Sequence, residues 1–224
     1  MPESIADRIT SLSQQLPTST KLIAVSKTHS TDKIRAAYDV GIRDFAENRL
    51  QEALSKQQEL ADLTDIRWHF IGHLQKNKAK KAIAHFDWIH TIDSLALAQK
   101  LNTYAESLGR SPKFCLQVKP LPDPNKFGWD IEQLFQELSK LAQCKHLKIQ
   151  GLMTILPLGL NPSETLAAFQ SVKNLKDKLN QHPAVPFELQ DLSMGMSGDY
   201  HQAIKAGSTM IRVGSAIFGQ RQYK

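Results

Sequence analysis

The chain has 224 residues, of which 41% are hydrophobic and 22% charged, a balance typical of folded globular proteins rather than disordered ones. Its 28 basic and 22 acidic residues give a net charge of +6, and its two cysteines are too few for a disulfide scaffold. No apolar run approaches the roughly 18 residues of a membrane span, and the N-terminus lacks the apolar run of a signal peptide. We therefore expect a cytoplasmic protein that does not enter a membrane, with Cys115 and Cys144 reduced.

The basic excess includes one local cluster, formed by Lys76, Lys78, Lys80 and Lys81. Apolar residues recur at helical spacing through the same segment, so the lysines are best interpreted as the solvated face of a helix. No interleaved aromatic residues accompany them, and no known nucleic-acid module is present. We therefore predict no nucleic-acid partner.

In chain order, the predicted elements alternate between β-rich and amphipathic helical runs. A helix is predicted from Pro2 to about Gln15. Predicted strands then occupy residues 22–28, 44–48, 67–72, 88–92, 113–119, 148–155, 187–195 and 208–214. Helices are predicted between them at residues 31–41, 49–60, 75–86, 93–109, 131–143, 163–181 and 197–207. The expected caps are Thr31 or Asp32, Asp93 or Ser94, and Ser163 at helix starts, with Gly41 and Gly109 at helix ends.

Eight strands separated by seven helices predict parallel βαβ units. The favoured architecture is a single (β/α)8 barrel of TIM type over residues 1–224, in which the N-terminal helix takes the place of a missing eighth helix on the outer ring. An open, doubly wound parallel sheet is the alternative, because the same alternation also permits it. No linker or change in composition divides the chain into two domains.

In a barrel of this type, functional groups gather where the strands end. Lys27 ends an apolar strand, so it either extends to the rim as a salt-bridge partner or lies in a pocket that makes its amine nucleophilic. Arg212 shares a strand face with Gly214, which favours a position facing a ligand over a salt bridge deeper in the barrel.

Small residues near the C-terminus suggest an anion site. Ser193 and Ser197 flank Gly195 at the end of the seventh predicted strand, and Gly214 and Ser215 stand at the end of the eighth. Barrels commonly hold a phosphate group at the loops after these strands, although a glycine-rich turn that caps a helix would look the same. We predict no metal site, because the pair His69 and His73 lacks a third ligand nearby. Common hydrolase, nucleotide and dinucleotide motifs are absent from the sequence.

A family likeness runs from about Leu22 to Gly219. It rests on the segments LIAVSKT, FAENRLQE, WHFIGHLQKNK, HTIDS, GLMTI and LSMGMSGD, followed by AIKAGSTMIRVGSAIFG. Together and in this order they resemble the pyridoxal-phosphate homeostasis proteins, a family of single barrels similar to the N-terminal domain of alanine racemase. The final segment differs from many relatives in having serine where they have threonine, which keeps the hydroxyl group.

The resemblance implies roles for particular residues. Lys27 resembles the lysine that forms an internal aldimine with pyridoxal 5′-phosphate (PLP), and Arg212 resembles the partner of the pyridine nitrogen. The resemblance further implies a phosphate cup and a group of ring-lining residues, namely Ser193, Ser197, Gly214 and Ser215 for the cup and Asn48, His69 and Met153 for the ring.

The function implied is control of vitamin B6 and amino-acid pools by a monomer that holds PLP, with PLP-dependent apoenzymes as candidate recipients. An arginine at the pyridine nitrogen cannot accept a proton, and the chain leaves no room for the second domain that supplies a racemase with an opposing acid or base. We therefore assign no catalytic residue and predict no significant turnover. The alternative is a PLP-dependent amino-acid racemase.

Overall fold

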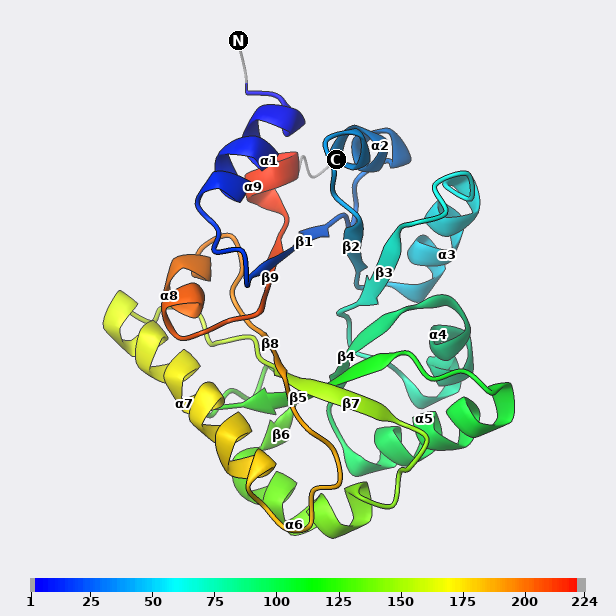
Figure 1. Ribbon diagram of the computed structural model, residues 1–224, viewed down its shortest axis with the longest axis vertical. Coiled ribbons are helices and arrows are strands. Elements are labelled where there is room, and N and C mark those ends of the chain that lie inside the picture. The colour runs from blue at the N-terminus through cyan, green and yellow to red at the C-terminus, as the bar shows by residue number, and fades with distance from the viewer. Residues whose placement is uncertain (1–2, 221–224) are drawn as a thin grey trace.

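The computed structural model describes residues 3–220, and the strands of this part form a closed parallel barrel. The order around the barrel is β1, β2, β3, β4, β5, β7, β8 and β9, and pairings of β4 with β5 and of β9 with β1 close it (Figure 1). A two-residue strand, β6, pairs only with the end of β5. The strands are β1 Lys21–Val25, β2 Asp44–Glu47, β3 Arg67–Phe70, β4 Trp88–Ile92, β5 Lys113–Lys119, β6 Trp129–Asp130, β7 Lys148–Met153, β8 Asp191–Ser193 and β9 Met210–Val213.

Helices surround this barrel and connect successive strands (Figure 1). The barrel prediction is confirmed, and the open sheet is excluded by the pairing of β4 with β5. The helices are α1 Ile5–Gln14, α2 Thr31–Asp39, α3 Leu50–Glu59, the 3₁₀ turn η1 Lys76–Lys78, α4 Ala79–His85, α5 Leu95–Leu108, α6 Ile131–Leu141, α7 Pro162–Asn180, α8 Tyr200–Lys205 and α9 Ser215–Phe218.

Alternation along each strand separates two apolar layers. In β1, Ala24 joins the large core between the barrel and its helices, whereas Ile23 and Val25 join a smaller cluster inside the barrel. In β9, Ile211 lies in the outer layer and Met210 in the inner one. Because side chains on a strand alternate between its two faces, this pattern places residue 212 inside the barrel.

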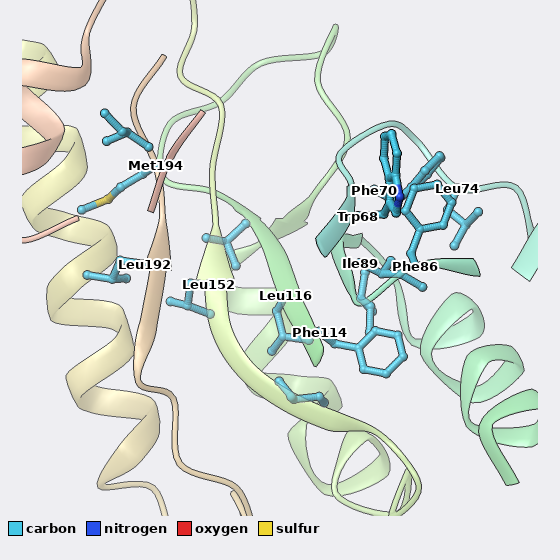
Figure 2. Close-up of a cluster of buried hydrophobic side chains, with 14 of the residues drawn as sticks. Trp68, Phe70, Leu74, Phe86, Ile89, Phe114, Leu116, Leu152, Leu192 and Met194 are labelled. Atoms are coloured by element: carbon cyan, nitrogen blue, oxygen red, sulfur yellow. The ribbon is translucent and has the colours of Figure 1, made fainter. Parts of the chain in front are cut away.

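Most of the buried apolar side chains belong to the outer layer, part of which Figure 2 shows. Ile89 and Phe114 are register partners on β4 and β5, and both are fully buried between the strands and the helices. On the adjoining strands, Leu152 and Leu192 are paired in the same way on β7 and β8. Burying a side chain of this size contributes about 1.5–3 kcal/mol, so this layer is the main source of stability for the barrel.

The first and last helices lie side by side and complete the outer ring (Figure 1). The prediction that no helix follows the last strand is wrong, because α9 forms there, although it has only four residues. The longer α1 packs against both α2 and α9 and covers that part of the barrel. It begins at Ile5 after the capping residue Ser4, and Pro2, where the predicted helix began, lies outside the described residues.

Two predicted helix caps are shifted towards the N-terminus. Asn161, not Ser163, caps α7, because its side chain accepts the N–H groups of Ser163 and Glu164 while Pro162 takes the first helical position. Ser30 precedes α2 in place of Thr31 or Asp32. Among the described residues, no helix is both long and apolar enough to cross a membrane.

Candidate functional site

A cavity of about 700 Å³ opens at the carboxyl end of the barrel strands. Six of the nine predicted site residues lie on its wall: Lys27, Asn48, Ser197, Arg212, Gly214 and Ser215. They come from segments that follow β1, β2 and β8, and from the end of β9, so the closed barrel brings together residues far apart in the sequence. The wall also includes residues that the sequence analysis did not select, among them His29, Gly72, His73 and Phe127.

The other three predicted residues lie deeper in the barrel. His69, Met153 and Ser193 are fully buried, and none of them is on the cavity wall. Each belongs to a strand that ends at or one residue beyond it, so its side chain points into the barrel interior one layer below the rim. Met153 packs in the apolar inner cluster, whereas His69 and Ser193 join a network of hydrogen bonds.

Lys27 follows β1 and is half-buried beside the cavity. The residues on either side of it are tightly held. Ser26 donates its hydroxyl to Glu47 Oε1 at 2.7 Å, and its carbonyl accepts Lys56 Nζ at 2.8 Å. On the other side, Glu52 Oε1 accepts the Thr28 N–H at 2.6 Å.

These partners of the Lys27 segment form an ion cluster of their own. Lys56 Nζ lies 2.8 Å from Glu47 Oε1 and 2.7 Å from Glu52 Oε1, and the Lys56 side chain is only 8% exposed. Burial raises the pKa of Glu47, and its second carboxyl oxygen, Oε2, has no hydrogen-bond partner among the described residues. Burial would also raise the pKa of Glu52, but the hydrogen bonds from Lys56 and Thr28 outweigh it and lower that pKa.

The backbone beside Lys27 is also unusual. Thr28 has φ +68°, the left-handed region that residues other than glycine rarely adopt. The hydrogen bond to Glu52 holds this conformation, and the chain leaves β1 sharply at Lys27 instead of continuing as a strand. Strain that the surrounding contacts enforce is common where a protein positions a functional group.

Arg212 faces the same cavity but has a different kind of support. It is 2% exposed, and its Nη2 donates to the carbonyl of Thr154 at 2.8 Å while its Nη1 donates to Ser193 Oγ at 2.7 Å. Among the described residues it forms no ion pair. The alternative of a salt bridge deeper in the barrel is therefore wrong, because the partners of Arg212 are neutral oxygens.

From Ser193 a chain of hydrogen bonds crosses the barrel interior. Ser193 Oγ lies 2.8 Å from His90 Nδ1, and His90 Nε2 lies 2.9 Å from His69 Nδ1. The chain ends where His69 Nε2 lies 2.9 Å from Asp44 Oδ1. We call this set of residues, Arg212, Ser193, His90, His69 and Asp44, the relay.

The end groups of the relay determine its proton positions. Arg212 can only donate, and an ionised Asp44 can only accept. With both imidazoles neutral, each link then has one direction: Ser193 donates to His90 Nδ1, His90 Nε2–H donates to His69 Nδ1, and His69 Nε2–H donates to Asp44. Each ring nitrogen and hydroxyl group of the relay then has a hydrogen-bond partner. The neutral groups Ser193, His90 and His69 thus lie between a cation, Arg212, and an anion, Asp44.

The electrostatics of the relay agree with this assignment. Burial lowers the pKa of His69, and it lowers the pKa of His90 well below the ordinary value, so both rings are neutral near pH 7. Burial would raise the pKa of Asp44, but hydrogen bonds from Arg67 and His69 outweigh it and hold that pKa well below its usual range. Burial lowers the pKa of Arg212 to about 10, which still leaves the guanidinium charged at neutral pH.

A serine and glycine rim completes the wall near Arg212. Gly195 has φ +97°, and a Cβ atom there would lie 2.6 Å from the Cβ of Ala203, so the turn before Ser197 requires glycine. Gly214 precedes α9, and the N–H groups of Ser215 and Ala216 in the first turn have no acceptor within that helix. Hydroxyl and backbone N–H donors therefore converge on one side of the cavity, where an anion would be favoured.

An imidazole and an aromatic ring lie at the cavity mouth. His73 stacks on Phe127 with ring centroids 3.7 Å apart, and its Nδ1 lies 2.9 Å from Asp93 Oδ2. Phe127 belongs to the proline-rich loop after β5 and is 54% exposed, while its carbonyl accepts Gln117 Nε2 at 2.8 Å. His73 and Phe127 both line the cavity, so this stacked pair forms part of its wall.

These residues fit PLP as a group. The cavity brings a lysine amine, a buried guanidinium and a set of hydroxyl and N–H donors to one volume, which matches the aldehyde, pyridine nitrogen and phosphate of PLP. At about 700 Å³ the cavity is within the range typical of cofactor sites. The ion cluster beside Lys27 and the residue His90 were not selected from the sequence, although the spacing of Glu52 and Lys56 and the alternation in WIHTI contained signals for them.

Comparisons with known proteins agree with the geometry. The family model for the alanine racemase N-terminal domain matches residues 2–222. A pyridoxal phosphate homeostasis protein from Synechocystis sp. is 53% identical over 206 residues, which covers 92% of this chain and 94% of that protein. The structure of PipY from Synechococcus elongatus PCC7942 with PLP bound is 52% identical, has a TM-score of 0.92, and covers 96% of this chain and 100% of that one.

Racemases are more distant. An alanine racemase from Clostridium difficile 630 in complex with cycloserine is 18% identical with a TM-score of 0.78, and the match covers all of this chain but 61% of that one. This likeness supports the barrel fold alone. On the family model and the curated relatives together, the chain belongs to the pyridoxal phosphate homeostasis protein family, which shares the fold of the alanine racemase N-terminal domain.

Proposed function

We propose that this chain binds PLP in the cavity at the carboxyl end of the barrel and serves vitamin B6 and amino-acid homeostasis without significant catalytic turnover. The observation that carries the proposal is the placement of Lys27 and Arg212 in one cavity with the serine and glycine rim. The family name of the relatives and the PLP-bound PipY structure support the same cofactor.

Each group on the wall has a chemical task in this proposal. Lys27 supplies the amine that carries PLP covalently, and Ser197, Gly214 and Ser215 hold its phosphate by hydroxyl and N–H donation. Ser193 supports this site indirectly, because its hydroxyl group bonds Arg212 and His90. When bound, PLP supplies an electrophilic carbon and an electron-withdrawing ring.

Arg212 limits the chemistry that follows. Its guanidinium only donates hydrogen bonds, so it cannot hold a proton on the pyridine nitrogen as a carboxylate would. Among the described residues, the cavity wall contains no Asp, Glu, Tyr or Cys side chain to take that role or to act as an opposing acid or base. A weak electron sink and few proton-transfer groups favour a carrier or regulator over an enzyme.

A racemase-type enzyme is the second candidate, and one observation favours it. His73 lies on the cavity wall, and Asp93 orients its ring through the bond to Nδ1, which is the arrangement of an imidazole base. His73 is also stacked on Phe127 at the mouth, a placement that equally serves to cover the site.

The first experiment tests binding. PLP added to the purified protein should produce the visible absorbance band of lysine-bound PLP, and Lys27→Ala should remove it. Lys80→Ala, which changes an exposed lysine on α4, is the matched control and should keep the band. A wild-type protein without the band, or a Lys27→Ala variant that retains it, would overturn the proposed site.

The second experiment tests turnover and transfer. The PLP-loaded protein is incubated with each L-amino acid, and D-enantiomer or keto acid is measured. Product at about one turnover per second or faster, abolished by His73→Gln, would establish the enzyme instead of the carrier. Faster activation of an unrelated PLP-dependent apoenzyme by the loaded protein than by free PLP would support transfer to apoenzymes, and equal or slower activation would exclude it.

We also propose that the protein acts as a monomer, which light scattering of the loaded protein tests.

A further inference from the structure

A second cavity, of about 340 Å³, lies at the amino end of the barrel strands, opposite the first. Basic residues dominate its wall. Four of them are the first residues of alternate strands in the sequence, and a fifth precedes β5: Lys21 of β1, Arg67 of β3, Lys113 of β5, Lys148 of β7, and Arg110. We call these five residues the basal ring.

Strand register brings the basal ring together. Lys113 is the register partner of both Trp88 on β4 and Lys148 on β7, and Arg67 is the partner of Asp44 on β2. Because all strands of a parallel barrel begin at the same end, first residues in matching register share one rim. The concentration of cations is therefore a consequence of the fold and cannot be recognised as a cluster in the sequence.

The acids near this cavity do not balance the basal ring. Arg67 bonds Asp44 at 2.6 and 2.9 Å, and Arg110 lies 3.4 Å from Asp87, the one acid on the wall. Within residues 3–220, no carboxylate lies within ion-pair distance of Lys113 or Lys148. The wall itself carries five cations against one acid, Asp87, and Asp44 pairs with Lys21 and Arg67 from beyond the wall. Asp191, the first residue of β8, is not on the wall and accepts the Thr209 hydroxyl, so the wall keeps an excess of positive charge.

Two of the lysines make cation–π contacts with the same aromatic ring. Lys21 Nζ lies 5.9 Å and Lys113 Nζ 5.2 Å from the ring centroid of Trp88, which is 4% exposed at the base of the cavity. Cation–π contact partly offsets the repulsion between the two ammonium groups, and an anion between them would offset it further. Lys21 is only loosely paired, with its Nζ 3.7 Å from Asp44.

We propose that the basal ring is a second anion site, separate from the PLP cavity, that binds a small phosphate-bearing dianion. The charge excess suits a dianion, and three flexible lysines around a concave surface suit a compact tetrahedral group. A cavity half the volume of the PLP cavity fits inorganic phosphate or a small phosphate monoester. The two sources share the same chemistry, and the experiment separates them.

The test is a titration of the ¹⁵N-labelled, PLP-loaded protein with inorganic phosphate and, in a second arm, with glycerol phosphate, at constant ionic strength. The backbone amides of Lys113 and Lys148 and the indole N–H of Trp88 report on the basal ring, while the amides of Ser197 and Ser215 report on the PLP cavity. We expect saturable shifts at the basal reporters in at least one arm, and tighter binding in one arm identifies the source of the phosphate group.

Variants separate a built site from a diffuse charge effect. Lys113→Gln/Lys148→Gln should weaken the basal Kd at least tenfold, because both lysines are exposed, lack acidic partners and can be replaced without disturbing the core. Lys145→Gln/Lys178→Gln removes the same charge from two exposed lysines that do not line the cavity and should leave the Kd within about twofold. Shifts that do not saturate in either arm, or equal weakening in both double variants, would overturn the proposal.

Discussion

The two cationic residues of the PLP cavity are supported in opposite ways. The Lys27 segment is held by charges, through Glu47, Glu52 and Lys56, which pair at 2.7–2.8 Å. Arg212 is held by neutral groups, namely a hydroxyl and a carbonyl, with Ser193 leading to the relay. The first support lies between the barrel and its helices, where Glu47 of β2 meets Glu52 and Lys56 of α3. The second lies inside the barrel, so the two supports differ in location as well as in chemistry.

This difference matches two tasks. The bend beside Lys27 is held by ion pairs, in which a charged donor meets a charged acceptor, whereas the charged Arg212 donates to neutral oxygens. An arginine that meets a ligand must keep its charge available, and neutral partners orient it without neutralising it. The comparison therefore predicts that damage on the Lys27 side destabilises the fold most, whereas damage on the Arg212 side mainly affects the ligand.

The largest effect is expected from Lys56→Met. Removing this ammonium group leaves Glu47, which is fully buried, without its charge partner, and breaking a buried pair in this way costs about 3–5 kcal/mol. Chemical denaturation measures the loss. Glu47→Gln/Lys56→Met should recover part of it, because the second change removes the uncompensated charge, and a loss below about 1 kcal/mol in the single variant would show that the cluster contributes little.

The next effect is a dependence of stability on pH to which the two histidines of the relay should contribute. The pKa values of His69 and His90 are lowered in the folded state, so both rings take up protons more readily when the chain unfolds. Their contribution to stability is complete above the unfolded value of about 6.5 and declines as the pH falls below it. Between pH 7.5 and 5.5 we expect this contribution to the free energy of unfolding to fall, by up to about 1.4 kcal/mol for each ring that stays neutral in the folded protein at pH 5.5.

Replacement of one ring isolates this contribution. His90→Gln should reduce the loss of stability between pH 7.5 and 5.5, whatever its effect on stability at pH 7.5, because one titrating group is removed. His201→Gln, at an exposed position on α8, is the control and should leave the slope close to that of the wild type. An unchanged slope in His90→Gln would mean that this ring is not held neutral in the fold.

The fold and the cavity wall were predictable because they depend on periodicity. Alternation in β9 placed Arg212 inside the barrel, and strand ends located Lys27 and Asn48 on the wall. The ion cluster beside Lys27 and the relay beside Arg212 were not predictable, because their roles depend on which side chains the fold buries. In the sequence, Lys56 has the pattern of an ordinary solvated helix residue, whereas the structure buries it.

The sequence also did not predict how deep a side chain lies along the barrel axis. His69 and Ser193 stand near strand ends by sequence, yet they lie one layer below the cavity. Inward side chains on a strand are two residues apart, so an error of two residues in the strand end moves a side chain from the rim to the layer below. Short strands such as β8, with three residues where nine were predicted, show the same limit. Their hydrogen bonds are set by neighbouring strands, which local sequence does not specify.

Ser193→Ala should have a smaller effect on stability and a specific one on PLP. It leaves Arg212 Nη1 and His90 Nδ1 without their shared partner, which costs about 1–3 kcal/mol. PLP affinity should fall about tenfold, a change of about 1.4 kcal/mol, as Arg212 loses its orientation. Ser208→Ala removes another buried hydroxyl, outside the relay, so it should lower stability without this loss of affinity. Equal affinities in the two variants would contradict the role of the relay.

The smallest effect tests the bend itself. Thr28 is exposed, so Thr28→Gly loses few contacts while relieving a left-handed backbone, and the higher entropy of glycine in the unfolded chain offsets part of the gain. We expect a net stabilisation of about 0.5–1 kcal/mol in chemical denaturation. Thr28→Ala, which keeps a Cβ atom at the same φ, should show no gain. Because the Glu52 carboxylate still accepts the residue 28 N–H in both variants, a difference between them isolates the backbone strain from the ion cluster that enforces it.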